Sequence, residues 1–179
     1  MLCEWKYGSL LRRNMIAQLN SHSRNTLTLH NQISIINTTV DEFSTKIVAD
    51  ALKIAVTGRR VLIVQLLKGG IRQGHDRVMN LAQNLDWIRC NLIRNISVSD
   101  LNDLELHNFQ QLWKHVRGAA KTSEYSLLIL DDLSLSIELG LISIEAATDF
   151  LTTIPEDLEV ILTGTSPHPA ILELLDVDS

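Results

Sequence analysis

The chain has 179 residues and a net charge of −5 at pH 7, and 45% of its residues are hydrophobic but only 4% aromatic. This length fits one domain, and so few aromatic residues predict a core of Leu, Ile, Val and Ala, as in parallel sheets covered by helices. The net negative charge gives no general basic surface for nucleic acid. The longest apolar run is too short to cross a membrane, and two cysteines are too few for a disulfide framework. We therefore expect a cytoplasmic protein.

The chain divides into an N-terminal appendage over residues 1–28 and a single α/β domain over residues 29–179. Within the appendage the pattern favours a helix over Ser9–Leu19. In the domain, short apolar runs predict strands at 32–37, 61–66, 86–91, 126–130 and 159–162. Amphipathic runs predict helices at 44–57, 72–84, 104–120, 144–153 and 170–174. Because helices connect successive strands, the expected architecture is a mostly parallel sheet with helices on both faces.

The first predicted strand and helix flank a segment in the position of a phosphate-binding loop. This segment, residues 37–45, reads NTTVDEFST. The phosphate-loop pattern needs glycines for close backbone approach and a lysine for the phosphates. Here Asn37 and Glu42 stand at glycine positions and Phe43 at the lysine position, whereas Ser44 keeps the hydroxyl. The framework of a nucleotide site is present, but most of its chemistry is replaced.

Ligands of a parallel sheet bind at the carboxyl ends of the strands, so function is expected where those ends carry polar residues. The apolar run 126–130 ends in Asp131 and Asp132, which is the form of a Walker B strand whose first acid holds a Mg²⁺ shell. The alternative is an ordinary turn, because turns favour Asp.

Two further strand ends carry small or charged residues. Lys68 and Gly69 follow the second predicted strand and would supply a cation and close backbone approach; a solvated turn explains them as well. Thr163 and Gly164 follow the last strand and would contact a base or ribose, although turn composition also explains them.

Together, three segments resemble the P-loop ATP:corrinoid adenosyltransferases, the family that makes the cobalt–carbon bond of adenosylcobalamin. They are RVLIVQLLKGG at 60–70, YSLLILDDL at 125–133 and IPEDLEVILTGTSPHPAILELLD at 154–176. The similarity extends from about Ile33 to Asp176. It implies a RecA-like P-loop NTPase fold and a homodimer. It also implies a reaction in which the cobalt of a reduced corrinoid attacks the 5′ carbon of Mg-ATP and expels triphosphate.

The same resemblance shows where this chain departs from the family. The family's Gly-Asn/Asp-Gly-Lys-Gly-Lys-Thr-Thr falls on residues 38–45, where Thr38, Val40 and Glu42 replace glycines, Asp41 and Phe43 replace lysines, and Ser44 and Thr45 keep hydroxyls. Lys68 and Asp131 are kept, Thr165 replaces an arginine, and the family's Phe-Thr-Trp falls near Asn95-Ile96-Ser97. A leaving triphosphate needs converging N–H donors and cations, so these changes disfavour Mg-ATP binding in the standard pose.

The leading hypothesis is therefore a non-catalytic or weakly active relative that acts as a dimeric binding or regulatory module, with a corrinoid or protein partner. Residual nucleotide positions would be Ser44, Thr45, Lys68, Thr163 and Gly164, and Asp131 would hold Mg²⁺. One alternative is an active cob(I)alamin adenosyltransferase that binds Mg-ATP and a corrinoid, with cations from elsewhere, such as Arg12 or Arg13. Another is a scaffold or interaction protein without a nucleotide ligand, because fold alone does not carry function.

Overall fold

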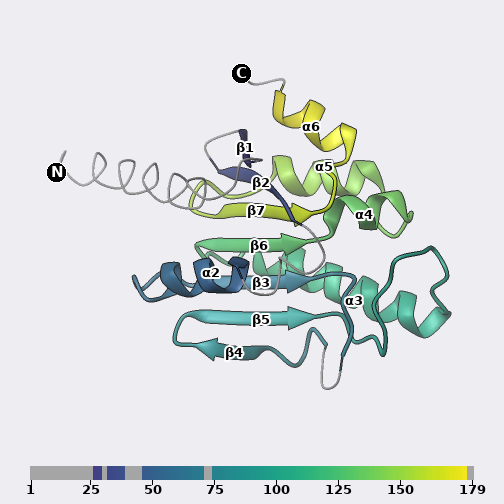
Figure 1. Ribbon diagram of the computed structural model, residues 1–179, viewed down its shortest axis with the longest axis horizontal. Coiled ribbons are helices and arrows are strands. Elements are labelled where there is room, and N and C mark those ends of the chain that lie inside the picture. The colour runs from purple at the N-terminus through teal and green to yellow at the C-terminus, as the bar shows by residue number, and fades with distance from the viewer. Residues whose placement is uncertain (1–25, 30–31, 39–45, 71–73, 177–179) are drawn as a thin grey trace.

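The computed structural model describes residues 26–29, 32–38, 46–70 and 74–176 (Figure 1). The strands are β1 Thr26–Leu29, β2 Ile33–Asn37, β3 Val61–Gln65, β4 Met79–Ala82, β5 Leu85–Arg89, β6 Leu127–Asp131 and β7 Glu159–Gly164. The helices are α2 Val48–Ala55, α3 Asp103–Ala119, α4 Leu133–Glu138, α5 Ile144–Thr152 and α6 Pro169–Asp176. No helix in these ranges is long and apolar enough to cross a membrane.

The strands form one seven-stranded sheet in the order β1-β2-β7-β6-β3-β5-β4. From β2 to β5 the neighbouring strands run parallel, whereas β1 and β4 pair antiparallel at the two edges. The arrowheads of β3, β5, β6 and β7 accordingly point the same way in Figure 1. The predicted mostly parallel α/β sheet is confirmed.

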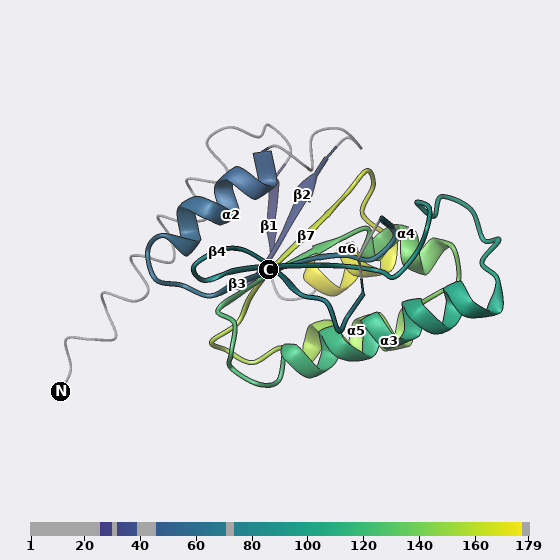
Figure 2. The ribbon, with the colours of Figure 1, turned by 90° about the horizontal axis from the view of Figure 1, so that it is seen from below.

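The two faces of the sheet pack against different helices. Figure 2 shows α2 on one face, with α3 and α5 on the other. Side chains alternate between these faces along a strand. Val61 and Ile63 of β3 join the core that includes Ala51 and Ile54 of α2, whereas Leu62 and Val64 join the larger core formed with α3, α4, α5 and α6. This alternation decides on which face the polar residues at the strand ends lie.

The helix predicted at 72–84 is wrong. From residue 74 onward this segment forms turns and then β4, which returns through a tight connection into β5. Asn84 adopts a left-handed backbone conformation, with φ of 68°, and its Nδ2 donates to the carbonyl of Ala55 at 3.4 Å. Asn tolerates this conformation better than most residues and favours a hairpin turn. Pairing with β5 therefore prevails over the helix propensity of the residues around Met79.

The other predicted strands and helices occur within a few residues of their expected positions. Besides β4, two elements of the described ranges were not predicted: β1, which pairs with β2, and α4, which is six residues long. A helix of that length spans fewer than two turns and so shows no clear period. The helix expected over Ser9–Leu19 lies outside the described residues.

Candidate nucleotide and metal site

A row of polar side chains crosses four neighbouring parallel strands where these strands end. Gln65 of β3 is the register partner of both Arg89 on β5 and Asp131 on β6, and Asp131 is in turn the partner of Thr163 on β7. The residues two positions earlier on β3, β6 and β7 belong to the α2-side core: Ile63, Ile129 and Ile161. Because side chains two positions apart share a face, the row lies on the α2 face at the carboxyl edge of the sheet.

Hydrogen bonds join this row from end to end. Nε of Arg89 donates to Oε1 of Gln65 at 2.6 Å, and Nε2 of Gln65 donates to Oδ2 of Asp131 at 3.2 Å. From the other side, Oγ1 of Thr163 donates to Oδ1 of Asp131 at 2.9 Å. Asp131 is only 2% exposed, so both of its carboxylate oxygens are fixed by protein donors rather than by bulk water.

A second acid and a lysine lie beside this row. Nζ of Lys68 is 3.6 Å from Oδ2 of Asp132. Asp132 has a left-handed backbone, with φ of 63°, and its N–H donates to the carbonyl of Thr163 at 2.9 Å. A Cβ on Gly164 would lie 3.7 Å from Oδ1 of Asp132. The strand ends of β3, β6 and β7 therefore bring the predicted residues Lys68, Asp131, Thr163 and Gly164 together.

Burial raises the pKa of both acids. Burial raises the pKa of Asp131 to about 7, and the neighbouring charge of Asp132 acts in the same direction. The hydrogen bonds from Thr163 and Gln65, together with the charge of Lys68, lower this pKa but do not cancel the increase. Burial also raises the pKa of Asp132, against the opposing effect of Lys68. A cation added at this site would favour the ionised carboxylates.

The donor set fits magnesium carried by a phosphorylated ligand. Asp131, Asp132 and Thr163 present oxygen atoms, the ligands that Mg²⁺ prefers. Within the described ranges no group of three or more His, Cys, Asp or Glu could hold a metal ion alone. Magnesium in nucleotide sites takes one or two carboxylates and completes its shell with water and phosphate oxygens. The arrangement thus suits a metal–nucleotide complex better than an independent metal centre.

The start of the predicted phosphate loop lies next to this cluster. The N–H of Thr38 donates to the carbonyl of Gly164 at 2.8 Å, and Oδ1 of Asn37 is buried with no hydrogen-bond partner in the described part of the chain. The remaining loop residues predicted to be degenerate or to bind phosphate lie outside the described residues: Val40, Asp41, Glu42, Phe43, Ser44 and Thr45.

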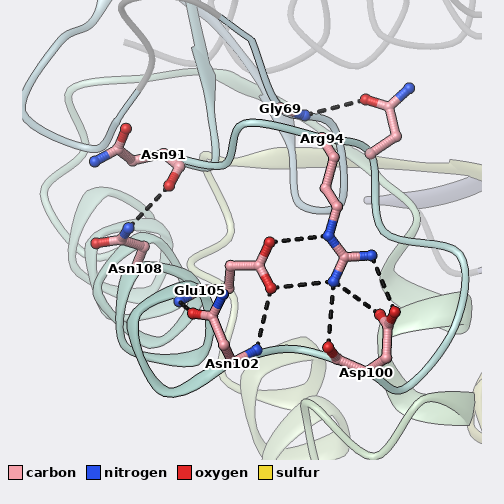
Figure 3. A network of polar contacts seen from close by, with 8 residues as sticks. Gly69, Asn91, Arg94, Asp100, Asn102, Glu105 and Asn108 are labelled. Carbon is pink, nitrogen blue, oxygen red and sulfur yellow. Dashed lines mark hydrogen bonds and ion pairs between the residues drawn. The ribbon is translucent and has the colours of Figure 1, made fainter.

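The connection from β5 to α3 is held by a network around Arg94 (Figure 3). Its guanidinium donates to both carboxylate oxygens of Glu105, at 3.0 and 3.1 Å, and to Oδ1 of Asp100 at 2.8 Å. Glu105 also closes a capping box with Asn102 at the start of α3. The hydrogen bonds from Arg94 hold the pKa of Glu105 below its usual value. One carboxylate thereby ties the connection to the helix that follows it.

Next to this network, the segment near Asn95-Ile96-Ser97 contacts the loop that follows β3. Oδ1 of Asn95 accepts from the N–H of Gly69 at 3.2 Å, and the N–H of Ile96 donates to the carbonyl of Leu67 at 2.8 Å. The side chain of Ile96 is buried. Where the resemblance places an aromatic wedge, this chain has a buried aliphatic residue and a polar anchor.

Sequence reasoning missed the roles of Gln65 and Arg89. Gln65 was part of the Gln-x-x-Lys-Gly segment that carried the resemblance, but only the strand register shows that it faces Asp131. Arg89 lies at the end of a strand that was predicted correctly. The available signal was the period of two along each strand, which places Gln65 on the same face as Ile63.

The fold and the site define a mostly parallel α/β protein with a carboxylate-and-lysine cluster at the carboxyl ends of its strands. A family model for ATP:corrinoid adenosyltransferase BtuR/CobO/CobP matches residues 44–179, and the chain belongs to this family. The corrinoid adenosyltransferase of Escherichia coli is 23% identical over 130 residues, which cover 68% of this chain and 61% of that enzyme. An uncharacterized protein of Nostoc sp. is 26% identical over 126 residues, which cover 67% of this chain and 33% of that protein. The chain thus spans about three fifths of the first relative and one third of the second.

Proposed function

We propose that this chain is a weakly active or non-catalytic adenosyltransferase relative that keeps the metal-facing half of the nucleotide site. The observation that carries the proposal is the hydrogen-bonded row that fixes both oxygens of Asp131, with Lys68 beside the second acid. A buried acid with a raised pKa destabilises the fold when it is ionised, which an ordinary turn does not require. Such groups cluster at functional sites. A RecA-like variant of the α/β fold belongs to the same proposal.

In this proposal each strand end has a separate task. Asp131 would hold the magnesium shell, Thr163 fixes the second oxygen of that carboxylate, and Lys68 balances the charge of Asp132. When bound, Mg-ATP would supply the 5′ carbon and a triphosphate leaving group whose charge the metal screens. The chain's own residues orient the metal-facing carboxylate and exclude water from it, as the 2% exposure of Asp131 supports.

The other half of the site is altered in sequence. In the alignment with the family, Asp41 and Glu42 put negative charge at positions of the phosphate loop, and Phe43 stands in place of a cation. Two like charges within about 4 Å of each other cost about 4 kcal/mol near a protein surface. These residues lower the affinity for triphosphate even if Asp131, Thr163 and Lys68 still bind the metal side of the ligand.

A second candidate, an active cob(I)alamin adenosyltransferase, is favoured by the family match over residues 44–179. In this case Lys68 and Arg89 would be cations near the carboxylate cluster, with others supplied by parts of the chain outside the described residues. We also propose a homodimer located in the cytoplasm, with a corrinoid or a protein as its partner.

The test compares the native chain with a Glu42→Gly, Phe43→Lys double variant, using calorimetric titration with Mg-ATP. We expect no measurable heat of binding for the native chain, and partial recovery in the variant because Asp41 and the other non-glycine positions remain. Adding Asp131→Asn to the double variant should abolish the recovered binding, because the metal-facing carboxylate is lost.

An activity assay decides between the candidates. The purified chain is given cob(I)alamin and Mg-ATP under reducing conditions, and adenosylcobalamin formation is followed by absorbance. A rate near that of active relatives would contradict the leading proposal and establish the second candidate. Failure of both the native chain and the double variant to bind ATP, ADP or a corrinoid would instead point to a scaffold.

A further inference from the structure

Gln65 lies between an arginine and an acid, and its amide can in principle face them in either of two orientations. The amide carries an acceptor oxygen at one end and a donor NH₂ group at the other. An ionised carboxylate accepts hydrogen bonds only, and a guanidinium donates only. With Arg89 on one side and ionised Asp131 on the other, one orientation forms two hydrogen bonds, and the flipped orientation forms two repulsive contacts. Arg89 alone favours the same orientation when Asp131 is protonated.

The observed contacts match the favourable orientation. Oε1 of Gln65 faces Nε of Arg89 at 2.6 Å, a short distance typical of a charge-assisted bond, and Nε2 faces Asp131 at 3.2 Å. Gln65 is 3% exposed, so water has little access to replace either partner. The guanidinium of Arg89 is itself held, because its central carbon lies 4.5 Å from the ring centroid of Trp87, two positions earlier on β5.

We infer that Arg89 is a positioning residue: it takes the carbonyl oxygen of Gln65, directs the amide NH₂ onto Asp131, and so fixes this carboxylate for a divalent cation. The part that concerns the cation rests on the proposed function, whereas the orientation of Gln65 does not. Thr163 fixes the other oxygen of Asp131, so the two neighbouring strands clamp the acid from both sides. The hydrogen bonds connect Arg89 to Asp131 through Gln65, and the two opposite charges also attract each other directly. Arg89 is therefore a positioning residue and not one that touches the ligand.

The first experiment reads the Gln65 side-chain amide in the ligand-free protein by ¹⁵N–¹H NMR. The signal is assigned by its disappearance in Gln65→Leu. In Arg89→Leu we expect the signal to move and its hydrogen exchange to accelerate roughly tenfold, because the partner that fixes the amide is gone. Arg89→Lys, which still donates to Oε1, should retain most of the native protection. An unchanged Gln65 signal in Arg89→Leu would overturn the inference.

Arg117 provides a matched control. Its guanidinium lies 5.8 Å from the ring centroid of Trp113 on α3 and so also stacks on an aromatic ring, but away from the polar row. Arg117→Leu should leave the Gln65 signal unchanged. Arg89→Met serves as a second removal variant if Arg89→Leu does not fold, which circular dichroism establishes beforehand.

The second experiment titrates Mn²⁺ alone and follows paramagnetic broadening of backbone signals around Asp131. We expect Arg89→Leu to require several times more Mn²⁺ than the native chain, and Arg89→Lys to restore most of the affinity. In a double-mutant cycle, Arg89→Leu should add much less loss to Gln65→Leu than it causes in the native chain, because the arginine acts mainly through the glutamine. Fully additive losses would contradict the inference. Absence of Mn²⁺ broadening in the native chain would instead contradict the metal site of the proposed function, while the Gln65 amide signal still decides the role of Arg89.

Discussion

The ammonium nitrogen of Lys68 lies 3.6 Å from Oδ2 of Asp132, so the cation that follows β3 meets the acid that follows β6. The lysine side chain is 21% exposed and the acid 11%, which places the pair between a surface and a buried ion pair. Lys68 lowers the pKa of both Asp131 and Asp132. Its charge therefore partly offsets the repulsion between two adjacent acids.

Replacing Lys68 should reveal this repulsion in a pH-dependent way. In Lys68→Met the pKa values of Asp131 and Asp132 rise further, so both acids are more costly to ionise. We expect a loss of about 1–3 kcal/mol in the free energy of unfolding at pH 8, and a much smaller loss at pH 5, where Asp131 is already protonated. Urea unfolding at both pH values measures the difference.

The control is Lys53→Met on α2. Lys53 pairs with Asp50 at 2.8 Å, but its side chain is 77% exposed. An exposed pair of this kind contributes at most about 1 kcal/mol, so its removal should matter little at either pH. Equal losses for Lys68→Met at pH 5 and pH 8 would show that its charge does not act on the acids.

Asp131 should make the native chain less stable as the pH rises. Its pKa in the folded state is about 7, above the ordinary value of 3.8, so its protonated form is favoured by folding. Its contribution to stability is fully present below about pH 4 and is lost as the pH rises through 7. Asp131→Asn removes this titration, so the variant should gain stability relative to the native chain between pH 4 and pH 8. Because one pKa unit corresponds to about 1.4 kcal/mol, a gain of about 1–4 kcal/mol is expected.

The measurement is urea unfolding of both proteins at pH 4.5, 6 and 8. The quantity compared is how the difference in unfolding free energy between the two proteins changes with pH. The amide of Asn cannot accept hydrogen bonds from both Gln65 and Thr163, and the resulting loss of stability is the same at every pH. A stability difference that stays constant from pH 4.5 to 8 would show that Asp131 titrates at its ordinary value.

Gly69 should be intolerant of any side chain. A Cβ at this position would overlap the backbone carbonyl oxygens of Arg94 and Leu92, the latter at 2.5 Å. The carbonyl of Leu92 accepts from the N–H of Gly70 at 2.9 Å, and Arg94 is held by Glu105 and Asp100. Gly69→Ala should therefore cost about 1–3 kcal/mol in thermal or urea unfolding. Gly118 on α3 has open space around it, and Gly118→Ala should stabilise the protein by about 0.5–1 kcal/mol. A neutral Gly69→Ala would mean that the two loops move apart easily.

The sheet could be predicted from sequence because its central strands are apolar runs between turn residues. The run from Val61 to Leu67 has every side chain buried, so periodicity and composition agree there. The prediction at 72–84 was wrong because an edge strand has partly exposed side chains and no such run. Leu81, for example, is 41% exposed, and the pairing partner that defines β4 comes later in the chain.

The candidate site was predicted in part for a related reason. Asp131, Lys68 and Thr163 stood out because they end apolar strands, and the structure brings them together. Gln65 and Arg89 remained unrecognised because their contacts depend on which strands are neighbours. The strand order places β3 between β6 and β5, although β5 follows β3 in the chain and β6 comes much later. No pattern within one strand contains that information.

Asp132 occupies the corner where β6 gives way to α4, with φ of 63° and ψ of 28°. Non-glycine residues held in this region cost on the order of 1 kcal/mol or more. At a corner that only redirects the chain, glycine would adopt this conformation with less backbone strain. A carboxylate is kept there, 3.6 Å from the lysine that follows β3, so at this bend the position of a charge takes precedence over an unstrained backbone.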